Sequence, residues 1–220
     1  MLDALIARGF SGAIRTLTGA RALWQGSIPS AGHRVYYGNH ASHGDFVMIW
    51  SALPAALRRD VRPVAGADYW TQGWLRRYVI RNVFNAVLIE RDPGRRSEDP
   101  IQTLCQAVDE GASLILFPEG TRNTGEGVLP FKSGIYHLAR KRPELEFIPV
   151  WLDNLRRVMP KGQLLPLPLL CTARFGAPLR LTADEEKQAF LDRARRALIA
   201  LDGETLPGAS AASSTSEIDR

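Results

Sequence analysis

The chain has 220 residues, of which 45% are hydrophobic and 23% charged, so it can form one globular domain with a substantial core and leaves little room for a second. No run of about 18 to 20 uninterrupted apolar residues is present and the first residues lack a secretory signal layout, so we expect a protein on the cytoplasmic side, without a transmembrane helix. The formal net charge of +5 favours an anionic partner, but not nucleic acid, because no nucleic-acid-binding module is recognisable.

The first 24 residues predict an amphipathic helix. Between residues 2 and 24, apolar side chains recur at helical spacing and arginines fall on the other side. Two placements fit this pattern: the apolar stripe packs on the domain, or the helix lies in a membrane interface with Phe10 and Trp24 at the acyl boundary. The second placement predicts a peripheral protein bound to an anionic membrane surface.

Residues 25–207 alternate between short apolar runs and helical stretches. Strands are predicted over residues 34–38, 61–66, 86–90, 113–117, 146–152 and 171–176, and helices over residues 46–57 with a break near Pro54, 74–84, 99–111, 134–140 and 183–201. This alternation is typical of an α/β domain, here with a mixed, largely parallel sheet flanked by helices. The tail over residues 208–220 is small and polar, and we expect it to be disordered.

The segment "NHASHGD", residues 39–45, gathers several polar groups directly after the first of these strands. Three interpretations fit its residue types. His40, His43 and Asp45 are suitable metal ligands, although the other histidines form no recognisable metal motif with them. His40 and Asp45 are equally suitable as a general base and its orienting carboxylate. In the third interpretation, Ser42 or Asp45 simply caps the helix that follows.

The segment "FPEGTR", residues 117–122, follows a buried strand in the same way. Strand ends are where ligands bind in open α/β sheets. Gly120 permits a tight turn, Thr121 offers a hydroxyl, and Arg122 offers a planar fork of donors suited to phosphate. Lys132 follows a few residues later. A capped turn with a surface arginine is the simpler alternative for this segment.

Together, the two segments resemble the motifs of the glycerolipid acyltransferase family, whose best-known members are the lysophosphatidate acyltransferases. The His-x4-Asp motif of that family is matched by His40 and Asp45, with Asn39 and Ser42 also at matching positions. The Phe-Pro-Glu-Gly-Thr-Arg motif is matched in full by residues 117–122. This pair of motifs is highly specific.

Two further family motifs are matched less closely. The motif Gly-x-x-Phe-Ile-Asp-Arg is similar to residues 85–91, "NAVLIER", which keep Arg91 but replace the glycine and the phenylalanine. Residues 147–150, "FIPV", look like the short fourth motif. The resemblance covers about residues 34–180, so the predicted domains are an N-terminal helix over 1–24, an acyltransferase domain over 25–207 and a tail over 208–220.

The resemblance implies transfer of a fatty acyl group from acyl-CoA or acyl-carrier protein to a lysophospholipid hydroxyl, with 1-acylglycerol-3-phosphate as the leading candidate acceptor and phosphatidate as product. His40 would be the general base and Asp45 would fix its tautomer. Positions 40 and 45 are about 140° apart on a continuous helix, so His40 must precede the helix. A different acceptor, or a non-catalytic lipid-binding protein on the same fold, is the alternative.

The resemblance also implies an acceptor site without a metal or a resident cofactor. Arg91 and Arg122, together with Lys132, would hold the acceptor phosphate. Glu119 would either hydrogen-bond the acceptor or orient Arg122. The predicted acceptor-binding residues are Asn39, Ser42, Arg91, Glu119, Gly120, Thr121, Arg122 and Lys132.

Overall fold

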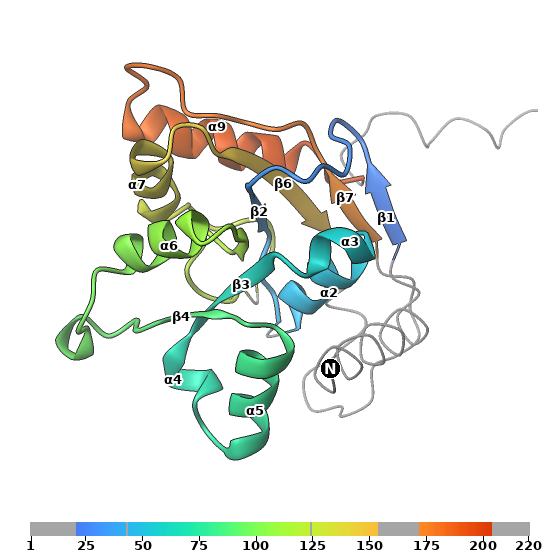
Figure 1. The fold of residues 1–220 in the computed structure, drawn as a ribbon. Helices are drawn as coiled ribbons and strands as arrows, with labels where there is room; N and C mark the ends of the chain where they lie inside the picture. The colour runs from blue at the N-terminus through green and yellow to red at the C-terminus, as the bar shows by residue number, and fades with distance from the viewer. Residues whose placement is uncertain (1–20, 43, 124, 154–171, 204–220) are drawn as a thin grey trace, which may run out of the picture.

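The computed structural model describes residues 21–42, 44–123, 125–153 and 172–203, and the centre of this part is a seven-stranded sheet (Figure 1). The strands follow the spatial order β1-β7-β6-β2-β5-β3-β4. Their bounds are β1 Arg21–Trp24, β2 Arg34–Gly38, β3 Val61–Gly66, β4 Val87–Ile89, β5 Ser113–Leu116, β6 Glu146–Leu152 and β7 Thr172–Phe175.

Helical segments connect most of these strands. They are α2 Asp45–Ala52, α3 Ala55–Arg58, α4 Ala67–Trp70, α5 Trp74–Tyr78, the π-helical η1 Val79–Val83, the 3₁₀ turn η2 Pro93–Arg95, α6 Pro100–Asp109, α7 Gly134–Lys141 and α9 Lys187–Ile199. The predicted break near Pro54 is confirmed, because α2 ends at Ala52 and Pro54 is the N-cap of α3. Of the described helices, none combines the length and the apolar character that crossing a bilayer requires.

The sheet is mixed and largely parallel, as predicted. β6, β2, β5, β3 and β4 pair in parallel, β1 is parallel to β7, and only β6 and β7 pair in the antiparallel direction within the described chain. Because the carboxyl ends of parallel strands meet at one edge of a sheet, the loops that follow β2, β3, β4 and β5 converge there.

The hydrophobic core lies on both faces of the sheet, because successive side chains of a strand point in opposite directions. On β2, Tyr37 packs with residues of α6, α7 and α9, including Leu138 and Phe190. Its neighbour Tyr36 packs with residues of α2 and η1, including Ile49 and Ile80. Helices therefore flank the sheet on both sides, which confirms the predicted fold class (Figure 1).

The predicted N-terminal helix is wrong at its C-terminal end. Arg21–Trp24 form β1, an edge strand that pairs in register with β7, and the Trp24 ring stacks on Phe175 with centroids 4.0 Å apart. The spacing of the apolar residues predicted a helix here because the pairing with β7 and the stack of Trp24 on Phe175 arise only in the tertiary structure. Trp24 therefore belongs to the sheet. Residues 1–20 and the predicted tail over 208–220 lie outside the described residues.

The last helix begins later than the sequence pattern predicts. It starts at Lys187 rather than at residue 183, with Glu186 at the N-cap. Asp184 has a φ of +63°, in the left-handed region, which a right-handed helix cannot include. Asp184 and Glu185, which the predicted range of 183–201 would include in the helix, therefore lie before it.

Candidate active site

The paired side chains of His40 and Asp45 lie at the carboxyl end of β2. β2 ends at Gly38 and α2 begins at Asp45, so His40 lies in the intervening loop, as the geometric argument requires. His40 Nδ1 and Asp45 Oδ2 are 2.8 Å apart. The aspartate side chain is fully buried and the histidine ring is 11% exposed. When the proton between them resides on Nδ1, the free lone pair of the ring is on Nε2.

Asp45 is held by more than the histidine. Its Oδ2 atom also accepts hydrogen bonds from the backbone N–H groups of Ala41, at 2.7 Å, and Ser42, at 2.8 Å. The Ser42 hydroxyl accepts from the Gly44 N–H at 3.0 Å. These contacts fold the loop around the carboxylate, so Asp45 and Ser42 contribute to the local turn as well as to the pair.

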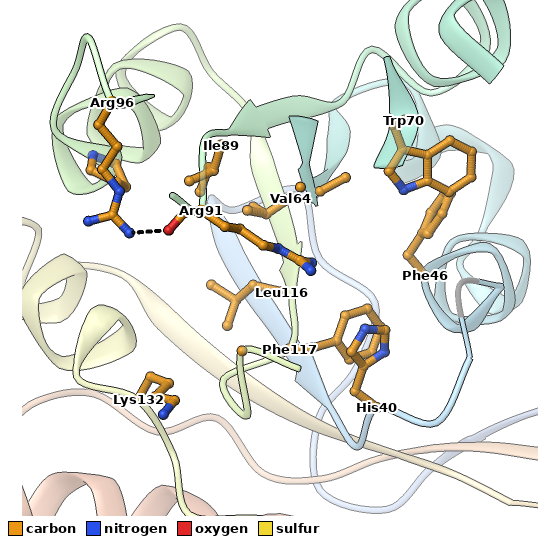
Figure 2. Close-up of a pocket in the computed structure, with 14 residues that line it drawn as sticks. His40, Phe46, Val64, Trp70, Ile89, Arg91, Arg96, Leu116, Phe117 and Lys132 are labelled. Carbon is orange, nitrogen blue, oxygen red and sulfur yellow. Dashed lines mark hydrogen bonds between the residues drawn. The ribbon is translucent and has the colours of Figure 1, made fainter. Parts of the chain in front are cut away.

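The His40 ring stacks on Phe117, which follows β5. The ring centroids are 4.3 Å apart and the planes are inclined by 13° (Figure 2). The two sequence motifs, more than seventy residues apart, therefore meet at this stack. Since His40 Nδ1 faces Asp45 and one ring face is covered by Phe117, the orientation of the imidazole is fixed from two directions.

Glu119 is buried beneath the same loop, with only 1% of its surface exposed. One carboxylate oxygen accepts from the His40 N–H at 2.8 Å and the other from the Leu129 N–H at 2.9 Å. Both hydrogen bonds hold backbone, and among the described residues Glu119 has no contact that orients Arg122. The structure thus gives Glu119 a role that the sequence analysis missed: it fixes the loop that carries the histidine.

Asn39 also holds backbone. Its side-chain oxygen accepts from the Leu152 N–H at 2.8 Å, and its amide nitrogen donates to the Leu152 carbonyl at 3.2 Å. On the other side of the loop, the Asn123 N–H donates to the His40 carbonyl at 2.7 Å. Asn39 therefore ties the histidine loop to β6, and its amide is engaged there rather than turned to an acceptor as predicted.

A pocket of about 490 Å³ opens beside His40 (Figure 2). Residues at the ends of β3, β4 and β5 line it. Its apolar residues include Phe46, Val64, Trp70, Ile89 and Leu116. The basic residues in its lining, besides His40, are Arg91, Arg96 and Lys132. One pocket thus offers both apolar surface and cationic groups.

Arg91 and Lys132 lie in the pocket as the sequence analysis predicts, whereas Arg96 was missed. Arg96 donates to the Glu90 carbonyl at 3.0 Å. It also donates to the Arg91 carbonyl at 3.1 Å (Figure 2). The η2 turn brings it back beside Arg91. A Cβ at Gly66 would lie 2.6 Å from the Arg91 guanidinium, so only glycine leaves room for that side chain there. The adjacent arginines in "GRRS" were the available sequence signal for Arg96.

The "FPEGTR" loop contributes less to the pocket than its sequence suggests. Gly120, with a φ of +71°, lines the pocket against Lys132. The Lys132 N–H donates to the Pro118 carbonyl at 2.7 Å, which joins the two segments. Thr121 and Arg122 are exposed and lie outside the lining. The structure therefore does not bring Arg122 together with Arg91.

The metal interpretation gains no support from the described residues. They contain no group of three or more His, Cys, Asp or Glu side chains arranged to hold a metal ion. His43, which the sequence analysis included as a candidate ligand, lies outside the described residues.

The architecture defines an α/β protein with a histidine–aspartate pair beside a pocket that is apolar and basic. The chain belongs to the Acyltransferase family, whose model matches residues 24–153. This agrees with the resemblance that the two motifs indicated.

Named relatives and a solved structure are similar to this chain. It is 31% identical over 112 residues to a 1-acyl-sn-glycerol-3-phosphate acyltransferase of Haemophilus influenzae, covering 48% of this chain and 42% of the relative. It is 28% identical over 181 residues to the enzyme of that name from Cocos nucifera, covering 78% and 56%. The chain thus spans about half the length of these relatives.

The crystal structure of the 1-acyl-sn-glycerophosphate acyltransferase PlsC from Thermotoga maritima superposes with a TM-score of 0.67 at 20% identity, covering 91% of this chain and 80% of that chain. At that identity the likeness establishes the fold.

Proposed function

We propose that this protein transfers a fatty acyl group from acyl-CoA or acyl-carrier protein to the hydroxyl of a lysophospholipid, with 1-acylglycerol-3-phosphate as acceptor and phosphatidate as product. The observation that carries the proposal is the pair formed by His40 and the buried Asp45, 2.8 Å apart, at the edge of a pocket with apolar and basic walls. Membership of the Acyltransferase family and the names of the relatives support it.

In the proposed reaction, Asp45 holds the Nδ1 proton of His40, and Nε2 takes the proton from the acceptor hydroxyl. The hydroxyl oxygen attacks the thioester carbonyl, a C–O bond forms, the C–S bond breaks, and the thiol leaves with the proton. General-base help of this kind contributes about 10² to 10⁴ in rate. No serine nucleophile is required, because the acceptor supplies the attacking oxygen.

The basic side chains of the pocket would bind the acceptor phosphate. Arg91, Arg96 and Lys132 line it together with His40. Arginine presents paired donors to phosphate, and positioning the hydroxyl over the base contributes to the rate as much as the base itself. Apolar residues of the same pocket, such as Val64 and Leu116, would contact an acyl chain. Arg122 is exposed and lies outside the pocket lining. Its predicted role would therefore be limited to contacting an acceptor phosphate at the surface of the "FPEGTR" loop.

Both the acceptor and the product are amphiphiles that reside in a bilayer. We therefore place the protein at the cytoplasmic surface of an anionic membrane, as a peripheral protein. The N-terminal segment remains the surface that the sequence predicts for this contact, although residues 1–20 lie outside the described residues.

A panel of acyl thioesters and lysophospholipids, with purified protein and detergent, tests the proposal. Phosphatidate should form from 1-acylglycerol-3-phosphate and a thioester. His40→Ala should lower kcat by at least about 10² with little change in the apparent KM for the acceptor, because the base acts chiefly in the transition state. Unchanged thermal unfolding of the variant is the control. If no acceptor yields a thioester-dependent product, the lipid-binding alternative replaces the enzyme.

A further inference from the structure

Helix α5 presents two large apolar side chains to solvent. Trp74 is 79% exposed and Leu75 57% exposed, and the one other large hydrophobic residue exposed in the described part of the chain is Ile28, at 75%. A single exposed apolar residue is ordinary, whereas an adjacent tryptophan and leucine on one helix mark a contact surface. Neither residue lines the pocket.

Helix α5 and the π-helical η1 that continues it are strongly basic. Residues 74–84, "WLRRYVIRNVF", hold three arginines and no acidic residue, and Arg76, Arg77 and Arg81 are exposed. The Arg76 guanidinium lies 4.5 Å from the centroid of the Tyr69 ring, and Arg77 donates to the Thr71 carbonyl at 3.1 Å. Arg76 and Arg77 are therefore held against the residues just before α5, the helix that carries Trp74 and Leu75.

This surface adjoins the pocket. α4 ends at Trp70, whose side chain lines the pocket, and only three residues separate it from Trp74, where α5 begins. α4 and α5 project beyond β3 and β4, at the lower end of the view in Figure 1. The acidic residue of α4, Asp68, lies toward Gly66 and Arg91 of the pocket.

We propose that Trp74 and Leu75, flanked by Arg76, Arg77 and Arg81, dock the protein on an anionic phospholipid bilayer. The docking would place the pocket beside the membrane from which, under the proposed function, the acceptor comes. Apolar side chains enter the acyl boundary while arginines meet anionic headgroups, which is the division that an interfacial helix requires. An acidic protein partner could pair with the arginines but would leave the adjacent tryptophan and leucine unexplained.

Co-sedimentation of the full-length chain with vesicles tests the docking surface. Vesicles of phosphatidylcholine with phosphatidylglycerol should bind the protein more tightly than phosphatidylcholine alone, and added salt should weaken the binding. The double variant Trp74→Ala/Leu75→Ala should lower the affinity at least about tenfold. Arg81→Glu should lower it about fivefold or more. Ile28→Ala removes an equally exposed side chain from the segment between β1 and β2 and should change nothing.

Activity on an acceptor dispersed in detergent separates docking from catalysis. The double variant and Arg81→Glu should keep wild-type turnover there, because none of the three residues lines the pocket. A double variant that binds anionic vesicles as wild type does overturns the proposal, and so does a wild-type protein without affinity for them. If the variant instead loses only binding to acyl-carrier protein, the surface serves a protein partner and the bilayer is excluded. Vesicle binding through α5 by a protein that forms no product would refute the proposed function and leave this inference standing.

Discussion

At the scale of single residues, Glu119 holds the backbone of the histidine loop and takes no part in the proposed proton transfer. Its buried carboxylate accepts hydrogen bonds from the backbone N–H groups of His40 and Leu129. It therefore fixes the two segments to which these residues belong. The same residue fills the glutamate position of "FPEGTR". Its identity was therefore recognisable in the sequence, whereas its role depends on the contact between two loops.

Glu119→Gln should destabilise the protein and slow the reaction. An amide has one acceptor oxygen, so one of the two N–H groups loses its partner inside the protein, at a cost of about 1 to 3 kcal/mol in unfolding free energy. Because Glu119 fixes the loop that carries His40, a weaker contact should misplace the imidazole, so kcat should fall while the acceptor KM changes little. Thermal unfolding and steady-state kinetics measure both effects. The exposed Glu126→Gln is the matched control, and equal behaviour of the two variants would contradict the positioning role.

Arg91 and Arg122 differ in the placement of their side chains. Since Arg91 lines the pocket and Arg122 does not, Arg91→Ala should raise the apparent KM for a phosphorylated acceptor by about tenfold, and Arg122→Ala by less. Kinetics with phosphorylated and unphosphorylated acceptors measure the difference. Equal losses on both acceptors would remove Arg91 from the phosphate site, and a larger effect of Arg122→Ala would return that site to the "FPEGTR" loop.

At the scale of secondary structure, α9 is anchored by a side chain that precedes it. Glu185 accepts hydrogen bonds from Arg193 at 2.8 and 2.6 Å, and Arg193 also donates to the Arg180 carbonyl at 2.8 Å. The hydrogen bond from Arg193, more than any other contact, holds the pKa of the Glu185 carboxyl below its ordinary value of 4.5. The pair therefore fixes the turn before α9 to the helix.

Glu185→Gln should lower the melting temperature most at neutral pH. A carboxyl with a lowered pKa in the folded state stabilises that state above its ordinary pKa of 4.5, and this contribution is lost as the pH falls through the lowered value. The loss should be about 1 kcal/mol at neutral pH and should vanish in acid. Melting curves from neutral to acidic pH measure it. A constant difference between variant and wild type across that range would show that the charge is not responsible.

At the scale of the whole molecule, the fold places the site where four parallel strands end. β2 carries the His40 loop, β5 leads to Phe117, β3 ends at Gly66, and β4 leads to Arg91. These segments are distant in the chain and adjacent in the sheet. The site is therefore assembled by strand order.

A chelator should leave the rate unchanged, because the proposed proton transfer uses the His40–Asp45 pair and the described residues offer no cluster of metal ligands. Activity measured before and after treatment with a chelator checks this. A loss of activity that added zinc restores would revive the metal interpretation of His40, His43 and Asp45.

The α/β class, most strands and helices, the family and the His40–Asp45 pair could be predicted from the sequence. Each of these depends on local pattern or fixed spacing: apolar periodicity reports helices and strands, and five positions separate the histidine from a carboxylate at the start of the next helix.

The remaining features depend on how distant segments pack in three dimensions. This packing made Arg21–Trp24 a strand, engaged Asn39 and Glu119 with backbone, brought Arg96 into the pocket and left Arg122 outside it. These outcomes depend on which backbone groups need hydrogen-bond partners and on which strands lie side by side. Residues that are adjacent in the chain can then face different surroundings, so residue type and spacing do not specify which of them meet.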